Sequence, residues 1–234
     1  MQYFLINLGK NLSYMLLIKR FLLVLGLISA TGVVSGQKVD LQFNGGYVFD
    51  NKIESPIASD YYYFARVMGG FQYGVSCSYL FPSSIGMELS YSGQNTELPM
   101  TILSDGVVVL NLRHNLRLHY VLGGGSYHYL TNDKLLDVSG TLMAGMLFAK
   151  LESSDKLYNA NESGFAWGIK GGCSVWLSQR FALNFQAMLL TAPEIIGGEF
   201  TFGVNSNTGG KGEKTPVTQI SGSGGLVFRL SGVK

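Results

Sequence analysis

Basic side chains interrupt the apolar run VVVLNLRHNLRLHYVL at residues 107–122. Arg113, Arg117 and His119 fall on one set of alternate positions, whereas leucines fill most of the other set. In an α-helix, at about 3.6 residues per turn, these leucines would scatter around the whole circumference. In a β-strand, successive side chains point to opposite faces, so the same spacing gives one apolar and one basic face. The run therefore predicts a strand that holds its basic groups on one side.

The same alternation recurs along the chain, and its polar positions supply further residues that could do chemistry. It is found at residues 39–49, 71–79, 85–92, 165–177, 181–189 and 219–230. Residues 134–151 are largely apolar at both sets of positions. The polar faces of these strands predict one candidate set: Asp40, Gln42, Glu88, Arg113, Arg117, His119, Lys170, Gln186 and Arg229. Facing a common interior, these groups could line a charge-selective pore or a ligand site, or they could pair with one another.

The connections between the predicted strands alternate in length. The short turns lie at residues 80–84, 131–134 and 178–180. The long, polar connections lie at residues 51–62, 94–106, 152–163 and 193–216. Four long and three short connections predict eight antiparallel strands, with both ends of the strand region on the short-turn side. Short turns at one end and long loops at the other are typical of transmembrane β-barrels.

The apolar faces need a cover, and the sequence offers no helices to provide one. Lipid is the simplest cover, because a closed barrel satisfies every backbone hydrogen bond within the membrane. The fold class expected is therefore an all-β, eight-stranded antiparallel up-and-down transmembrane barrel. Its interfacial aromatic girdles are expected to draw on Tyr73, Tyr79, Tyr91, Tyr120 and Trp167.

An eight-stranded barrel has an interior only just wide enough for side chains. Buried charges there must be paired or hydrated. We therefore expect the candidate set to form an ion-pair network that fills the lumen, with Glu88 as a partner for a basic residue of the 107–122 strand. A charge-lined pore is the alternative. His114 lies on the apolar side of its strand, which predicts an outward position beyond the bilayer.

The N-terminus has the pattern of a secretory signal peptide. Lys19 and Arg20 precede a short apolar stretch, and small residues then lead to Gln37. We expect a signal peptide at residues 1–36 and a barrel domain at residues 37–234. An N-terminal membrane anchor is the alternative, although the apolar stretch is shorter than the ~20 residues of a spanning helix.

Net charge argues against a nucleic-acid partner. Removing Lys10, Lys19 and Arg20 from the 17 basic residues leaves 14 against 15 acidic residues, a formal net charge of −1. Binding to nucleic acid depends on basic residues that neutralise phosphates. We therefore expect an exported protein that does not bind nucleic acid.

Both cysteines are predicted to face outward. Cys77 and Cys173 belong to the second and sixth predicted strands, which lie across the barrel from one another. A disulfide needs Cα atoms within about 7 Å. We therefore expect two free thiols that face lipid.

Three segments resemble a known group of proteins. They are ARVMGGFQYGVSCSYLFPSSIGMELSY (65–91), LHYVLGGGSYHYLTNDKLLDVSGTLMAGMLFA (118–149) and SGSGGLVFRL (221–230). They are similar to small bacterial outer-membrane β-barrel proteins of the OmpA/OmpX-like type, within the outer membrane protein β-barrel domain group. The resemblance covers nearly all of residues 37–234 and implies location in the bacterial outer membrane. One departure is the C-terminus, where the aromatic Phe228 lies inside a tail that ends RLSGVK.

Neither the resemblance nor the residues supply a catalytic or cofactor site. Ser126 with His128 invites comparison with barrel-embedded lipid hydrolases, but GGGSYHY lacks the second glycine of G-x-S-x-G and shows no acid as a third member. GGKGEKT at residues 209–215 departs from the phosphate-loop pattern, because Gly212 follows Lys211. We expect no enzymatic activity, no cofactor and no metal site.

The function expected is structural support, adhesion or partner recognition through the long outer loops, with outer-membrane lipid around the barrel. Residues 193–216, the longest of these connections, are the best candidate contact surface, because loops on a rigid scaffold commonly carry function. A small passive channel for ions or small solutes is the alternative. A secreted, soluble ligand-binding barrel is a third reading that the apolar outer faces disfavour.

Overall fold

A computed structural model describes residues 38–58, 61–104, 107–153, 159–196 and 215–230. The signal peptide expected at residues 1–36, the segment 209–214 and most of the connection 193–216 lie outside the described residues. Within the described part there are ten strands: β1 (Lys38–Val48), β2 (Asn51–Ala58), β3 (Tyr61–Val67), β4 (Gly70–Leu80), β5 (Ile85–Ser104), β6 (Val107–Leu130), β7 (Leu136–Ser153), β8 (Asn159–Trp176), β9 (Phe181–Ile196) and β10 (Thr215–Arg229). No helix in this part is long and apolar enough to cross a membrane.

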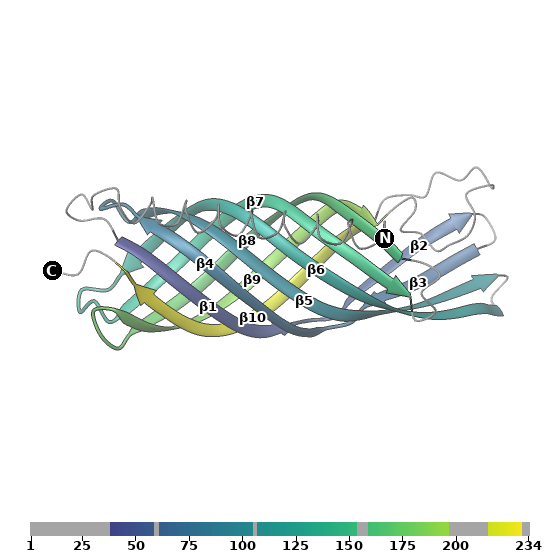
Figure 1. The fold of residues 1–234 in the computed structure, drawn as a ribbon, viewed down its shortest axis with the longest axis horizontal. Helices are drawn as coiled ribbons and strands as arrows, with labels where there is room; N and C mark the ends of the chain where they lie inside the picture. Colours follow the sequence, from purple (N-terminus) through teal and green to yellow (C-terminus); the bar gives the residue numbers. More distant parts are fainter. Residues whose placement is uncertain (1–37, 59–60, 105–106, 154–158, 197–214, 231–234) are drawn as a thin grey trace, which may run out of the picture. The chain divides into compact units, whose positions relative to one another are not determined.

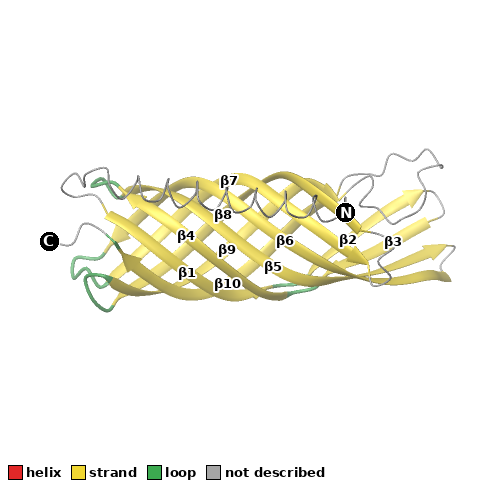
Figure 2. Cartoon of the chain, in the orientation of Figure 1, coloured by secondary structure: helices red, strands yellow, loops and turns green. Residues whose placement is uncertain are grey.

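Eight of these strands close into a barrel in which every pairing is antiparallel. The order around the barrel is β1, β4, β5, β6, β7, β8, β9 and β10, and β10 pairs back onto β1. Figures 1 and 2 show these strands running obliquely around the barrel. Closure leaves no free sheet edge along the barrel, so each backbone donor and acceptor of the wall has a neighbouring strand. The predicted eight-stranded antiparallel barrel is confirmed.

Two of the predicted loops are strands instead. Residues 51–62 were expected to be a loop but contain β2 and the start of β3, and β3 pairs with the far end of β5. Residues 94–106 were likewise expected to be a loop, yet β5 and β6 stay paired as far as Ser104 and Val107. Figure 1 shows β2 and β3 beyond the barrel wall at the end opposite the short turns. Polar composition misled the prediction, because a strand exposed to water on a face needs no apolar residues there.

Strand length shows that the barrel is taller than a bilayer requires. β6 has 24 residues and β5 has 20. A transmembrane strand needs only about 9–11 residues. The ends of these strands on the long-connection side must therefore rise well beyond the membrane, into water.

The side chains on the outer face of the wall change from apolar to polar along the strands. Near the short turns its exposed side chains are apolar, for example Tyr127, Leu142, Ile169, Phe185 and Leu226. Toward the long connections the outward positions become polar, at Asn95, Glu97, Asn115, Arg117, Lys150 and Asn161. The first region suits lipid and the second suits water.

The interior shows the opposite gradient. Near the short turns the buried inward side chains are polar or charged, as at Asp40, Ser78, Glu88, Asp137 and Asn184. Toward the long connections the interior becomes an apolar core: Val67, Leu98, Leu116, Leu118, Tyr120, Leu122, Met143, Leu147, Ala149, Leu151, Ala166, Met188, Leu190, Ala192 and Val217. The part of the barrel in lipid thus has an apolar exterior and a polar interior, and the part in water has the reverse.

Gly124 and Gly125 of β6 provide a test of how tightly the wall is packed. A Cβ added to Gly124 would lie 1.9 Å from the carbonyl oxygen of Leu142, whereas one added to Gly125 would meet nothing within 4 Å. We expect Gly124→Ala to lower the free energy of unfolding by about 1–3 kcal/mol through overpacking. The matched variant Gly125→Ala should leave it unchanged. Urea titration of the barrel refolded in vesicles measures both, and equal midpoints for the two variants would contradict the packing described for Gly124.

Candidate functional site

An ion pair joins the first and last strands of the barrel. Asp40 of β1 and Arg229 of β10 are direct cross-strand partners, and the guanidinium donates two hydrogen bonds of 2.8 Å to the carboxylate. The same guanidinium carbon lies 3.7 Å from the ring centroid of Trp176, a cation–π contact. Both charged side chains are at least nine-tenths buried. This cluster occupies the interior at the short-turn end and spans the seam where the barrel closes.

A second buried ion pair spans the lumen, farther from the short turns than the first. Lys170 of β8 donates to the carboxylate of Glu88 of β5, and their side chains are 6% and 3% exposed. The hydroxyl of Thr141 donates to the other carboxylate oxygen, at 3.4 Å. Because β5 and β8 are not neighbours in the wall, this contact ties together two sides of the barrel.

Amide side chains fill the interior between these ion pairs. The Gln42 amide nitrogen donates to the side-chain oxygens of Asn184, at 2.5 Å, and Gln186, at 3.0 Å. Asn184 in turn donates to the Ser174 hydroxyl at 2.9 Å. Hydrogen bonds of this kind compensate the cost of burying polar groups. The interior near the short turns thus holds several groups of hydrogen-bonded polar side chains, beside a small apolar cluster of Trp176, Ala182 and Val227.

A second chain of hydrogen bonds lies where these polar side chains meet the apolar core, on the side of the long connections. The Tyr120 hydroxyl donates to the side-chain oxygen of Gln219 at 2.9 Å, and the Gln219 amide donates to Gln94 at 2.8 Å. Tyr120 itself belongs to the apolar core and is 1% exposed. It was expected in an outer aromatic girdle, and that prediction was wrong.

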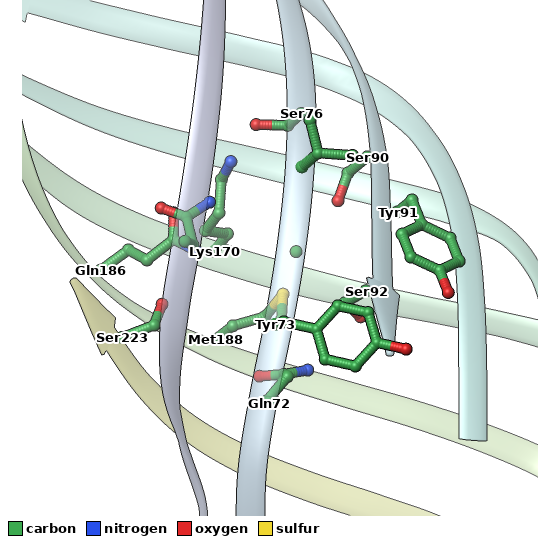
Figure 3. Close-up of a pocket in the computed structure, with 13 residues that line it drawn as sticks. Gln72, Tyr73, Ser76, Ser90, Tyr91, Ser92, Lys170, Gln186, Met188 and Ser223 are labelled. Carbon is green, nitrogen blue, oxygen red and sulfur yellow. The ribbon is translucent and has the colours of Figure 1, made fainter. Parts of the chain in front are cut away.

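A small cavity borders the polar side chains of the interior. A cavity of about 20 Å³ is lined by Gln72, Ser76, Lys170, Gln186 and Ser223, among others. Figure 3 shows Lys170, Gln186 and Ser223 gathered on one side of it, with the rings of Tyr73 and Tyr91 on the other. One water needs roughly 10–15 Å³ of such volume. The cavity is therefore of water size.

The structure brings together most of the candidate set. Six of the nine residues belong to the inward positions that are buried or half-buried: Asp40, Gln42, Glu88, Lys170, Gln186 and Arg229. The side chain of Arg113 lies outside the described part. Glu88 was expected to pair with a basic residue of the 107–122 strand, but its partner is Lys170. That expectation was wrong because strand register could not be derived from the sequence.

Arg117 and His119 point the opposite way from the prediction. Arg117 is 48% exposed and pairs with Glu152 at 3.1 Å on the outside of the wall. His119 accepts or donates a 2.9 Å hydrogen bond through Nδ1 with the Tyr91 hydroxyl, and the two rings stack. The alternate residues of β6, including Leu118, form the apolar core instead. The prediction assumed that apolar side chains face lipid, but this part of β6 begins where the outer face turns from apolar to polar, and from there its apolar side chains face inward.

The same reversal corrects the position of His114. It was expected to face outward, yet it is 5% exposed and shares the inward parity of Leu116. It lies in the part of β6 beyond the apolar outer band. Burial there lowers the pKa of its imidazole.

Asp137 supplies the acid that the sequence did not reveal beside His128. Its two carboxylate oxygens lie 3.2 Å from His128 Nδ1. Ser126 is 4% exposed, and its hydroxyl and His128 Nε2 are both buried without a hydrogen-bond partner in the described part. The histidine–acid half of a catalytic triad is thus present, but the serine–histidine hydrogen bond is missing. The two elements meet because β6 and β7 flank a short turn.

The cysteines are free, as predicted. Cys77 and Cys173 are half-buried on outward positions of β4 and β8.

Exchanging the residues of the central ion pair tests its role in stability. Lys170→Met leaves the Glu88 carboxylate buried without a counter-charge, so the free energy of unfolding should fall by about 3–5 kcal/mol. Adding Glu88→Leu removes the unpaired charge and should recover most of that loss. Urea titration followed by unboiled gel mobility measures both. Additive losses in the double variant would show that the two side chains do not form a coupled pair.

Comparison with known proteins agrees with this architecture. No family model and no curated protein matches the chain. Among solved structures, Neisserial surface protein A (NspA) aligns over 83% of this chain and 97% of its own, with 11% identity and a TM-score of 0.50. OprG, an outer-membrane protein of Pseudomonas aeruginosa, aligns over 85% and 98%, with 13% identity and a TM-score of 0.55. By its closed eight-stranded wall, its apolar outer band and these likenesses, the chain has the fold of the small β-barrels of the bacterial outer membrane.

Proposed function

We propose that the protein is a closed, non-enzymatic outer-membrane barrel that presents its long-connection end for adhesion or partner recognition. The filled interior carries this proposal. The polar layer around Glu88 and Lys170 and the apolar core around Leu118 and Leu147 succeed one another along the barrel axis. A solute would have to displace both layers. An interior that small matches the size of an eight-stranded barrel.

The architecture of the long-connection end supports a display role. Strands β2, β3, β5 and β6 continue as paired sheet beyond the closed wall. The apolar core below them includes Val67 of β3 and Leu98 of β5, so the extension shares its packing with the barrel. A rigid scaffold of this kind holds exposed segments in fixed positions, which is how many binding surfaces are built.

Conductance in planar lipid bilayers tests the closed interior. We expect the full chain to give no stable open state, because side chains fill the described interior. A sixteen-stranded porin in the same bilayer is the positive control, since its lumen holds water. Insertion of the chain is checked by its shift in gel mobility on boiling. A reproducible ohmic step at low voltage would overturn the closed barrel and favour the passive channel.

Epitope accessibility on intact cells tests the display. An epitope placed between Ala58 and Tyr61, which join β2 to β3, should be detected by antibody without permeabilisation. The same epitope placed after Asn132, in the short turn between β6 and β7, should be detected only after permeabilisation. The opposite result would mean that the long-connection end faces the periplasm.

A further inference from the structure

Two like charges face each other on the outside of the wall. Arg117 of β6 and Lys150 of β7 are direct cross-strand partners. Like charges in such a pair are destabilising. Glu152 lies beside both, at 3.1 Å from Arg117 and 2.7 Å from Lys150. One carboxylate therefore serves two cations, and the cluster keeps an excess of one positive charge.

These cations lie where the outer face changes from apolar to polar. The next outward residue of β7 toward the short turns is Phe148, and Met146 follows it. On β6, His119 and Val121 follow Arg117 in the same direction, and His119 is bound to Tyr91. Aromatic side chains at such a level are typical of the membrane–water interface. Arg117 and Lys150 are therefore at the height of the lipid headgroups.

A groove lies beside the cluster on this wall. Its volume is about 280 Å³, and its lining includes His119, Phe148, Lys150, Asn161 and Ser163. Phe148 supplies an apolar surface, and the other four supply polar groups. Ala149 and Glu162 complete the lining. They are paired across β7 and β8 at positions that share the inward parity of Leu147 and Ala166.

The excess of positive charge is local to this part of the wall. Among the outward side chains that the structure describes on the eight barrel strands, Arg117 and Lys150 are the two cations. Glu97, on β5, is acidic and lies opposite Asn115, the outward residue next to Arg117 on β6, but it forms no ion pair with Arg117 in the described structure. Asp50 and Arg66, at the base of the β2–β3 hairpin, lie 3.5 Å apart and balance one another. The rest of the described rim therefore offers no comparable attraction to an anion.

We propose that this outer rim binds the phosphate of an outer-leaflet lipid headgroup, between Arg117 and Lys150 with the acyl chains against Phe148. A phosphate supplies the negative charge that the cluster lacks and accepts charge-assisted hydrogen bonds from both side chains. The apolar wall below Phe148 favours an amphipathic ligand over a free anion. Each cation near a membrane surface contributes an attraction of about 1 kcal/mol, equivalent to about fivefold in binding.

Lipid retention measured by native mass spectrometry tests this site. The full chain is refolded in vesicles of phosphatidylcholine in which part of the lipid is replaced by phosphatidylglycerol, and then released. Phosphatidylglycerol should be retained in preference to phosphatidylcholine. Arg117→Gln or Lys150→Gln alone should each reduce that preference about fivefold, and the double variant should abolish it. Glu152→Gln, which removes the competing carboxylate, should strengthen it.

A matched control separates the site from net charge. Lys134→Gln with Arg180→Gln removes two cations from the short turns at the other end of the barrel and should leave the preference intact. Equal loss in this control, or full retention in the Arg117/Lys150 double variant, would overturn the proposal. Displacement of the lipid by inorganic phosphate at matched concentration would also overturn it, because the site would then bind the phosphate group without any contribution from the acyl chains. Heat-dependent gel mobility establishes that each variant is folded before it is compared.

Discussion

The structure depends on one constraint: a strand that passes from lipid into water must exchange the polarity of its two faces. Side chains still alternate in and out along the whole strand, but the solvent outside changes partway along it. In lipid the outward side chains are apolar and the polar ones turn inward. In water the order reverses. Strand β6 makes the change in its middle, between Tyr120 and the Gly124 region, so that Leu118 packs inside and Arg117 stands outside.

This exchange divides the interior into two layers, a polar one held by ion pairs and hydrogen bonds and an apolar one held by packing. The polar layer compensates two pairs of buried charges with partners far apart in sequence: Glu88 with Lys170, and Asp40 with Arg229. Removing one member of such a pair leaves an uncompensated buried charge, whereas removing both does not. The apolar layer is held by close packing and burial instead, like the core of a soluble protein. The apolar layer includes Val67 of β3 and Leu98 of β5, so it also supports the extension of β2, β3, β5 and β6.

The same boundary gives the outer wall its chemistry. Where apolar and polar outward positions meet, aromatic rings and basic side chains come side by side, as Phe148 and Lys150 do. A detergent or lipid molecule meets both at once, which neither the lipid-facing band nor the water-facing rim offers alone. The arrangement of Ser126, His128 and Asp137 is a different case, because it faces the interior and its serine and histidine are not hydrogen-bonded to one another.

The sequence by itself determined the number of barrel strands, their antiparallel order, the closure of the barrel and the outward thiols, because each follows from period-two alternation and from the lengths of the connections. It did not determine which face of β6 points inward, because alternation defines two faces without saying which solvent each meets. Nor could it reveal the strands within residues 51–62 and 94–106, or the partner of Glu88. Those were decided only by the tertiary structure, because register and height relative to the membrane depend on all eight strands at once.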